Sequence, residues 1–327
     1  MLMENRAGMV ALVGRPNVGK STLMNTLIGD KVSIITPMAQ TTRNQIRGIH
    51  NVPEGQIVYL DTPGIHQAKK QLNRYMVDVA FHSLEGVDLI LYLVDASRPD
   101  EAVVEMQNAS KKDKPHVGYG EDQMIIDRLN ELNTPCFLVI NKVDLISKKV
   151  NLLPLIEYYN GKGQFDEVIP ISATEAEGTE VLVQEILKRL PEGPPLFPPE
   201  YATDRPERFL VSEIVREKVI LTTREEIPHS TAIVVDVFDE SERDDVDEEA
   251  GRRGLIHIEA TVCVERDSQK GIIIGKRGAR LKEIGSLARA DIESLLGCRV
   301  FLKLWVKVDK NWSQNMRSLK RLGYEEI

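Results

Sequence analysis

The sequence predicts an α/β fold: a doubly wound domain with a mostly parallel sheet, followed by a second, smaller α+β domain. Two observations carry this prediction. Short apolar runs alternate with amphipathic stretches, and they are MVALV (9–13), IVYL (57–60), LILYLV (89–94), CFLVI (136–140) and VIPI (168–171). Such runs are typical of parallel strands that are covered on both faces. The alternation stops at PEGPPLFPPEYATDRP (191–206), a stretch too rich in proline for a helix or a central strand. We therefore predict domains over 1–190 and 207–327, joined by a stiff linker over 191–206.

The composition restricts the class of protein. A chain of 327 residues with 42% hydrophobic residues has room for two domains with real cores. Its three cysteines, Cys136, Cys263 and Cys298, are far apart, which argues against a disulfide framework or a zinc ribbon. No apolar stretch approaches the roughly 20 residues that span a bilayer, and the N-terminus leads almost directly into a strand. We expect a cytoplasmic protein.

The net charge of −8 at first argues against a nucleic-acid partner. The distribution of charge changes that conclusion. From Arg266 to the end there are 14 basic and 7 acidic residues, whereas the run DESERDDVDEE (239–249) holds 8 acidic residues and one arginine. The total therefore excludes a uniformly basic protein but leaves room for a local RNA-binding groove.

The second domain shows a different rhythm of elements. Helices and strands no longer alternate there, which indicates an α+β domain. We predict helices over 209–221, 281–296 and 311–322, strands over 229–238, 255–265 and 299–308, and a glycine turn at 275–278. Two segments read as loop insertions, 98–120 and the acidic run 239–249, and charge repulsion should leave the second one mobile.

The segment GRPNVGKS (14–21) matches the phosphate-binding pattern G-x-x-x-x-G-K-[ST], and it lies between the first strand and a helix predicted over 20–28. Glycines let the backbone amides turn toward phosphate oxygens, Lys20 supplies a charge to the β- and γ-phosphates, and Ser21 offers a hydroxyl to Mg²⁺. The predicted nucleotide contacts of this loop and of the helix start are Gly14, Asn17, Val18, Gly19, Lys20, Ser21 and Thr22.

The tetrapeptide DTPG (61–64) directly follows the second apolar run. Asp61 is placed to hold Mg²⁺ through water, and Gly64 can offer its amide to the γ-phosphate, with Thr62 and Pro63 completing the turn. Alone, DTPG is also a good turn sequence. Its position after a strand, behind the phosphate loop, favours a functional role.

The tetrapeptide NKVD (141–144) follows the strand at 136–140 and indicates the base. The carboxylate of Asp144 can accept both N–H donors of guanine, which adenine does not offer. Asn141 would hold the loop, and the stem of Lys142 can lie over the ring. In the segment ISA, Ser172 and Ala173 follow the last strand, and the Ala173 amide would lie near guanine O6.

These motifs, with QTTRN (40–44), stand in the order of the Ras-like P-loop GTPase superfamily, which the first domain resembles. The resemblance implies GTP or GDP as ligand, Mg²⁺ as cofactor, and a first switch in which Thr41 or Thr42 reaches the metal. It makes Lys20, Thr41, Thr42 and Gly64 the candidate catalytic residues, and Ser21, Thr41, Thr42 and Asp61 the candidate magnesium ligands.

Two departures bear on the mechanism. Ile65 stands where Ras-type enzymes carry the glutamine that orients water, so unaided hydrolysis should be slow. In related GTPases an asparagine at the position of Asn17 helps to bind potassium. In this sequence Asn17 either helps to bind potassium or only makes hydrogen bonds to the backbone of the phosphate loop.

The segment GIIIGKRG (271–278) contains a second glycine motif, G-x-x-G at 275–278. The same pattern at 251–254, GRRG, suits a hairpin turn, whereas residues 275–278 join two helical stretches and carry basic residues in the middle. That context resembles a type II KH domain, whose loop clamps single-stranded RNA. We expect RNA contacts from Gly275, Lys276, Arg277, Gly278, Arg280 and Lys282.

The strand RVFLKLWVKV (299–308) alternates between aliphatic residues on one face and basic or aromatic residues on the other. The second face could stack bases. In a KH fold, RNA runs along the glycine loop instead, so we favour a solvated or interdomain face.

A GTPase domain, a proline-rich linker and a KH domain in one chain resemble the Era family of bacterial GTPases over nearly the whole sequence. The resemblance implies binding near the 3′ end of 16S rRNA, action in assembly of the 30S ribosomal subunit, a monomeric protein, and peripheral association with the inner face of the membrane. A competing hypothesis is a GTP-dependent regulator whose second domain docks on protein or membrane, and a third is an ATPase.

Overall fold

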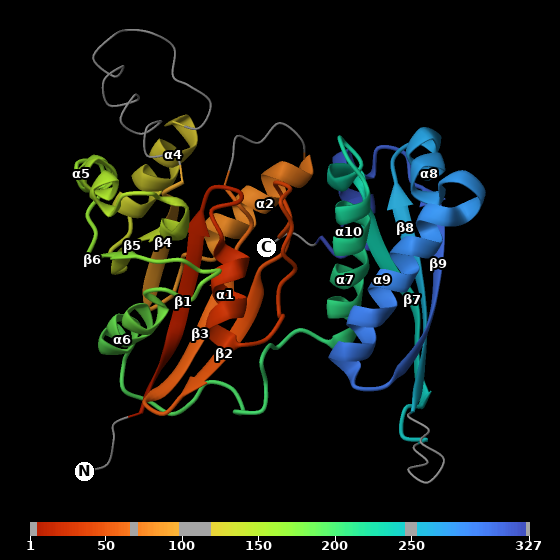
Figure 1. Cartoon of the computed structure of the whole chain (residues 1–327), viewed down its shortest axis with the longest axis horizontal. Helices are drawn as coiled ribbons and strands as arrows, with labels where there is room; N and C mark the ends of the chain where they lie inside the picture. The colour runs from red at the N-terminus through yellow and green to blue at the C-terminus, as the bar shows by residue number, and fades with distance from the viewer. Residues whose placement is uncertain (1–4, 66–70, 98–118, 246–253, 325–327) are drawn as a thin grey trace, which may run out of the picture.

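The computed structural model describes residues 5–65, 71–97, 119–245 and 254–324, which form two sheets with their own helices, placed side by side (Figure 1). The first sheet has the strand order β2-β3-β1-β4-β5-β6. Its strands are β1 (Arg6–Gly14), β2 (Ile46–Val52), β3 (Gly55–Asp61), β4 (Leu89–Asp95), β5 (Cys136–Asn141) and β6 (Glu167–Pro170). All neighbours pair in parallel except β2 and β3. The prediction of a mostly parallel sheet is confirmed.

Helices cover both faces of this sheet, as a doubly wound fold requires. On one face lie α1 (Lys20–Ile28) and α6 (Thr179–Arg189), whose leucines and isoleucines pack on β1, β3 and β4. On the other face lie α2 (Gln71–His82), α4 (Tyr119–Asn130) and α5 (Leu152–Asn160). The helix predicted over 20–28 is confirmed, and the carboxyl ends of β1, β4 and β5 meet at one edge.

Strand β2 is absent from the apolar runs that predict the other strands. Its sequence IRGIHNV mixes polar and apolar residues, because it is an edge strand with a partly exposed face. The strand forms by antiparallel pairing with β3 across a tight hairpin, from Ile46 opposite Asp61 to Val52 opposite Gly55.

The proline-rich segment 191–206 contains no helix or strand, although all its residues are described. It is not free of the first domain, because it runs along β2 and β3. The Ile49 amide donates to the Ala202 carbonyl at 2.8 Å, and the amides of Leu196 and Phe197 donate to Gln56 Oε1. The stiffness of the linker therefore comes from packing as well as from proline.

The second sheet has the order β7-β8-β9, with β7 antiparallel and β9 parallel to β8. Its elements are α7 (Glu207–Thr222), β7 (Ala232–Glu242), β8 (Leu255–Val264), α8 (Asp267–Ile274), α9 (Ala279–Leu296), β9 (Arg299–Val308) and α10 (Met316–Arg321). The order α7-β7-β8-α8-α9-β9 agrees with the predicted helices and strands and with the helical stretch expected before the glycine turn, and β9 has the predicted limits. One buried cluster from α7, α8, α9 and the inner face of the sheet forms the core.

Three details of the second domain differ from the prediction. The helix expected over 311–322 is a short turn, Trp312–Gln314, followed by α10, because Asn315 leaves the helical conformation and caps α10 with its side chain. The strand expected from His229 begins at Ala232, since Pro228–Ser230 forms a helical turn.

The third difference concerns the acidic run 239–249. Its first four residues, 239–242, are part of β7, because they pair with β8. Three parts of these predictions lie outside the described residues. They are residues 246–249 of the acidic run, residues 251–253 of the pattern GRRG, and residues 98–118 of the other insertion. Residues 119 and 120, expected in that insertion, begin α4.

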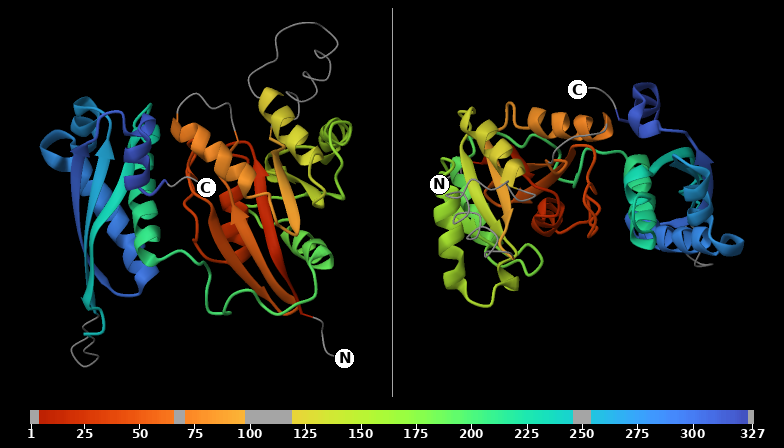
Figure 2. Two further views of the ribbon diagram at one scale, coloured as in Figure 1. Left: turned by 180° about the vertical axis from the view of Figure 1, so that it is seen from behind. Right: turned by 90° about the horizontal axis from the view of Figure 1, so that it is seen from above.

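The two domains meet through α7 and α10 of the second domain, while the sheet of the second domain lies on its far side (Figures 1 and 2). An apolar cluster joins Leu72 and Met76 of α2 to Trp312, Leu319 and Tyr324. Within the described residues, no helix has both the length and the apolar character that crossing a bilayer demands.

Candidate functional site

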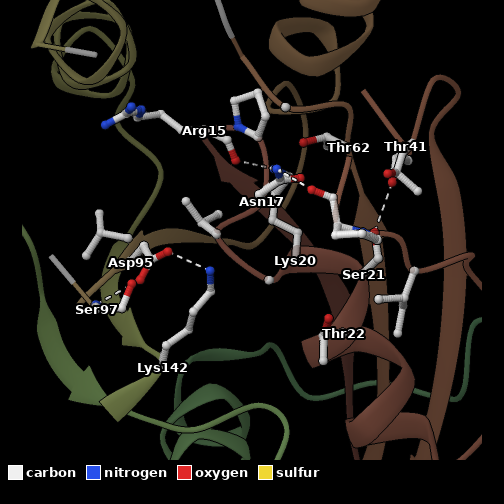
Figure 3. A pocket seen from close by; sticks show the side chains of 18 of the residues that line it. Arg15, Asn17, Lys20, Ser21, Thr22, Thr41, Thr62, Asp95, Ser97 and Lys142 are labelled. Atoms are coloured by element: carbon white, nitrogen blue, oxygen red, sulfur yellow. Dashed lines mark hydrogen bonds and ion pairs between the residues drawn. The ribbon is translucent and has the colours of Figure 1, made fainter. Parts of the chain in front are cut away.

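A cavity of about 680 Å³ opens at the carboxyl ends of β1 and β4. In open, mostly parallel sheets, ligands usually bind at the carboxyl ends of the strands, at the point where the strand order reverses. The phosphate loop 14–21 forms its floor, residues 34–42 one wall, and Lys142, Tyr158 and Tyr159 the opposite side. Figure 3 shows Lys20 and Ser21 at the loop and the Lys142–Asp95 pair across the pocket.

The amine of Lys20 lies inside the phosphate loop. Its Nζ donates to the carbonyls of Gly14 and Arg15, both at 3.0 Å, and the residue is only 6% exposed. Burial lowers the pKa of Lys20 to about 8, against the opposing charge of Asp61. The loop therefore holds a desolvated cation that gains strongly from an anionic ligand.

Asp61 is fully buried beneath the loop, surrounded by hydroxyl groups. Its Oδ2 accepts from Ser21 Oγ at 2.6 Å, Ser33 Oγ at 2.9 Å and Thr42 Oγ1 at 3.3 Å. Its Oδ1 is buried without a hydrogen-bond partner. Burial raises the pKa of the carboxyl, although the hydrogen bond from Ser21 opposes this.

This arrangement suits a magnesium ion. Mg²⁺ prefers oxygen ligands at 2.0–2.1 Å in an octahedron, so that two adjacent ligands lie about 3 Å apart. Ser21 Oγ and Thr42 Oγ1 are 2.9 Å apart. In the described part of the chain no group of three or more His, Cys, Asp or Glu side chains could hold a metal alone. The residues present fit a cation that shares its ligands with phosphate.

Of the two candidate threonines in the first switch, the structure brings only Thr42 to this cluster. The hydroxyl of Thr41 instead bonds within its own segment, to Thr36 Oγ1 at 2.5 Å and to the Met38 carbonyl at 2.7 Å. The two side chains thus have separate surroundings, which the sequence alone did not distinguish.

The DTPG turn approaches the phosphate loop so closely that a side chain at Gly64 has no room. A Cβ there would lie 2.7 Å from Pro16 Cα. Thr62 is buried and donates to the Leu12 carbonyl, and Pro63 is buried as well. Ile65 is fully buried in the core, so its side chain faces away from the cavity.

Asn141 joins three of the predicted motifs. Its Nδ2 donates to the Val18 carbonyl at 2.8 Å, and its Oδ1 accepts from the Ala173 amide at 2.9 Å. A Cβ at Gly19, where φ is +101°, would lie 2.2 Å from Asn141 Nδ2, so glycine is needed there. Ser172 is buried and accepts from the Glu175 amide.

The residues predicted to contact the base lie farther apart than those predicted to contact phosphate, and not all of them line the cavity. The Lys142 amine pairs with Asp95 Oδ2 at 2.5 Å, whereas Asp144 is exposed in the turn Val143–Leu145 and does not line the cavity. The Ala173 amide is bonded to Asn141, so its contact with guanine O6 stays a prediction.

Asn17 is exposed at the cavity, in a left-handed conformation with φ of 65°. Its Nδ2 donates to the Pro37 carbonyl at 3.1 Å, which ties the phosphate loop to the segment before the switch. Thr22 lines the same cavity from the start of α1.

The second glycine motif lies between α8 and α9, as predicted. Residues Lys276–Gly278 form a single turn with Arg277 at φ of 54°, and the side chains of Lys276, Arg277 and Lys282 are exposed. Arg280 Nη1 donates to the Ile272 carbonyl at 3.0 Å, which braces the loop from α9. The loop therefore presents its positive charges to solvent.

The basic and aromatic residues of β9 are solvent-exposed. The strand itself lies on the side of the second domain away from the first domain (Figures 1 and 2). Phe301 is 53% and Trp305 51% exposed. The face is therefore solvated and not interdomain, and base stacking on it stays a prediction.

Sequence reasoning missed four residues around the cavity and its walls. Asp95, the partner of Lys142, stands at the end of a predicted strand, and that position could have indicated it. No sequence pattern marks Ser33 beside Asp61 or the buried Arg216, and the sequence assigns no role to Arg43, although it stands within QTTRN.

The fold and these two loops define a class: a P-loop GTPase joined to a KH domain. Residues 9–142 match the family model described as "50S ribosome-binding GTPase", and residues 238–313 match the KH domain model.

Full-length relatives narrow the class. The chain is 50% identical to GTPase Era of Geobacter metallireducens over 320 residues, covering 98% of each protein, and 46% identical to GTPase Era of Syntrophus aciditrophicus. Two solved Era structures match this chain at 42% identity, and each match covers 98% of this chain and 100% of the solved chain. One is an Aquifex aeolicus Era variant bound to GDP and AlF₄⁻, with a TM-score of 0.85. The other is Era in complex with MgGDPNP and nucleotides 1506–1542 of 16S rRNA, with a TM-score of 0.86. The chain belongs to the GTPase Era family.

Proposed function

We propose that this GTPase is a switch that binds single-stranded RNA near the 3′ end of 16S rRNA through its KH domain, and that it acts in assembly of the 30S subunit. One observation carries the proposal: a single chain holds a phosphate-loop cavity and an exposed basic G-x-x-G loop, in the fold of an Era that is complexed with MgGDPNP and 16S rRNA nucleotides. The reaction is GTP + H₂O to GDP and phosphate.

In this proposal the triphosphate binds along residues 14–21, with the buried Lys20 amine beside the β- and γ-phosphates. Ser21, Thr42 and Asp61 would hold Mg²⁺, which neutralises phosphate charge when it is bound. The hydroxyl pair at 2.9 Å and the unpartnered Asp61 Oδ1 support this set. Thr41 is left with a structural role in its segment.

The base would bind near Lys142, with Asp144 accepting the two N–H donors of guanine. Exchanging Asp144 for Asn should remove most of the preference for GTP over ATP, because an amide cannot accept both donors. Competition of the two nucleotides for a fluorescent GDP measures this. An unchanged preference would favour the ATPase hypothesis.

Hydrolysis without a partner should be slow. The position after DTPG holds Ile65, which is buried, so its side chain cannot orient the attacking water. A potassium ion held by Asn17 could supply positive charge at the phosphates instead. The exposed position of Asn17 at the cavity supports this role, and its bond to Pro37 supports the structural one. Hydrolysis faster in KCl than in NaCl is expected, and equal rates would count against potassium.

Several further features belong to the same proposal. The domains would span 1–190 and 207–327 around the linker 191–206, which is supported by the end of α6 at Arg189 and the start of α7 at Glu207. A cytoplasmic location rests on the composition, and a monomeric state and peripheral association with the membrane rest on the family resemblance.

The decisive experiment titrates 30S subunits with protein loaded with GDPNP or GDP. We expect affinity that depends on the nucleotide, and loss of binding in the Lys276→Asp/Arg277→Asp variant. Equal, weak binding by the wild type and this variant would contradict RNA recognition by the loop and would favour the regulator that docks on protein or membrane.

A further inference from the structure

Three consecutive residues of the first switch, Thr41, Thr42 and Arg43, connect the cavity to the second domain. The hydroxyl of Thr42 lies 2.9 Å from Ser21 Oγ, in the candidate magnesium site. The side chain of Arg43, one residue later, is inserted into the second domain. Because Thr42 and Arg43 are adjacent in the sequence, one short piece of chain reaches both sites.

Arg43 is almost completely enclosed, with 2% of its surface exposed. Its Nη2 donates to the Pro228 carbonyl at 2.8 Å, and its Nη1 donates to the Thr231 carbonyl at 2.7 Å and to the Tyr324 hydroxyl at 3.0 Å. The guanidinium carbon also lies 5.9 Å from the centre of the Trp312 ring. Every one of these contacts is made with the second domain.

A buried guanidinium is stable only where its hydrogen bonds are made. Acceptors from three places, Pro228, Thr231 and Tyr324, bind its two Nη groups, whereas Nε is buried without a partner. These acceptors are in place only when the second domain is docked. Movement of the switch segment away from the cavity would draw the cation out of these contacts. Movement of the second domain would leave the cation buried without acceptors or expose it to water.

A second arginine holds the same segment from the other side. Arg216 of α7, 1% exposed, donates from Nη2 to the Thr41 carbonyl, and Glu213 fixes the guanidinium by accepting from its Nε at 2.8 Å. The residues before and after Thr42 are therefore both bonded to the second domain.

We propose that Arg43 is a positioning residue that couples the place of Thr42 at the magnesium site to docking of the second domain. With the segment fixed by Arg43, Thr42 is held where GTP and Mg²⁺ need it, and the docked arrangement is favoured by GTP in return, because coupling between two sites is reciprocal. GDP lacks the γ-phosphate that orders this switch, so the affinity for GDP should not depend on the coupling. The inference rests on the proposed nucleotide site and adds the residue that transmits its state.

The test compares affinities for Mg·GDPNP and Mg·GDP. Arg43→Ala should weaken Mg·GDPNP binding about tenfold, within the usual range of such couplings, and change Mg·GDP binding by less than about twofold. Arg74→Ala, an exposed arginine on the neighbouring helix α2, is the matched control and should change neither. Equal weakening for both nucleotides, or none for Mg·GDPNP, would overturn the proposal.

Two further variants separate coupling from a general loss of structure. In a Thr42→Ala background, Arg43→Ala should have no further effect on Mg·GDPNP affinity, because Arg43 acts through Thr42. Tyr324→Phe, in the other domain, removes one acceptor and should reproduce a smaller loss for Mg·GDPNP alone. Additive effects in the double variant would contradict transmission through Thr42.

Domain docking can be followed directly, because the native cysteines are buried. Dyes at Glu54→Cys and Ser286→Cys, both exposed, report the distance between the domains. With Mg·GDPNP the wild type should give a narrow distribution and Arg43→Ala a broad one, and identical distributions would overturn the inference. Lack of guanine-nucleotide binding by the wild type would instead contradict the proposed function, so the two failures are distinguishable.

Discussion

The protein contains two glycine loops that begin helices, and they are built in opposite ways. The phosphate loop is held by buried side chains: its own Lys20, and two residues from distant parts of the chain, Asp61 at the end of β3 and Asn141 at the end of β5. The loop at 275–278 is braced by its neighbour Arg280 and exposes its cations.

This difference indicates two modes of recognising phosphate. A preformed, desolvated site makes strong and specific contacts with one ligand, because its donors are oriented before binding. An exposed pair of cations on a short turn relies on charge attraction, which is screened by salt and suits a repeating backbone. The first mode fits a nucleotide and the second a strand of RNA.

The largest expected effect tests the preformed loop. Lys20→Met should weaken GDP binding about a hundredfold, since charge-assisted hydrogen bonds of a buried cation contribute about 3 kcal/mol. The thermal unfolding temperature of the nucleotide-free protein should be unchanged or higher, because a buried cation is costly. Titration with fluorescent GDP and calorimetry measure both.

Lys149→Met, an exposed lysine paired with Glu177, provides the control and should leave GDP affinity unchanged. If Lys20→Met binds GDP as the wild type does, the desolvated amine is not the main phosphate contact, and the contrast between the loops disappears.

A smaller effect is expected at the exposed loop. Lys276→Asp/Arg277→Asp should weaken binding of a single-stranded 16S 3′-end fragment about thirtyfold. It should also reduce the slope of log affinity against log salt by about 1.4, because two phosphate contacts of a single strand are lost. Fluorescence anisotropy at several KCl concentrations measures both quantities.

The matched control is Lys310→Asp/Arg317→Asp, which makes the same change in charge at exposed residues beyond β9. Equal losses in both variants would mean that overall charge, and not the loop, determines RNA affinity.

The smallest effect is a pH dependence specific to the nucleotide site. Burial lowers the pKa of Lys20 to about 8, and phosphate favours the protonated amine. GDP affinity should therefore be about tenfold weaker at pH 9 than at pH 7. Stability without nucleotide changes in the opposite direction. Between pH 8 and the ordinary lysine pKa the unfolded chain holds a proton that the native protein has lost, so this group makes the folded state more stable as pH rises.

Isothermal titration from pH 7 to 9 measures this dependence, and the Lys20→Met variant, which lacks the amine, should give a flatter profile. RNA binding by the exposed loop should change less over the same range. An equal decline for both ligands would contradict a specific role of the buried amine.

The sequence predicted much of the fold and of the site because both depend on local patterns. Apolar runs gave β1 and β3 to β6 within a few residues, and the alternation of Arg299–Val308 gave β9 with its exact limits. Mixed polarity concealed β2, whose existence depends on pairing with β3. The break before Met316 depends on a side-chain cap at Asn315, which competes with an otherwise helical pattern.

The limits of prediction at the site have the same origin. Motif order identified the residues around the cavity, but Thr41 and Thr42 are chemically alike, and only their three-dimensional surroundings separate them. Asp95 and Ser33 belong to no motif, and they reach Lys142 and Asp61 by way of strand pairing and loop folding.

What the sequence alone determined is the set of residues for the chemistry: glycines that leave room for phosphate, a lysine and hydroxyls beside them, a carboxylate expected to bind guanine, and a basic loop in a second domain. Those features depend on residue type and spacing along a strand or a turn. What only the tertiary structure decided is how the two domains are joined. Charged residues such as Arg43 and Arg216 are expected at the surface, and nothing local reveals that acceptors from about 180 residues away enclose them. Their burial depends on contacts between distant segments, which exist only in the folded chain.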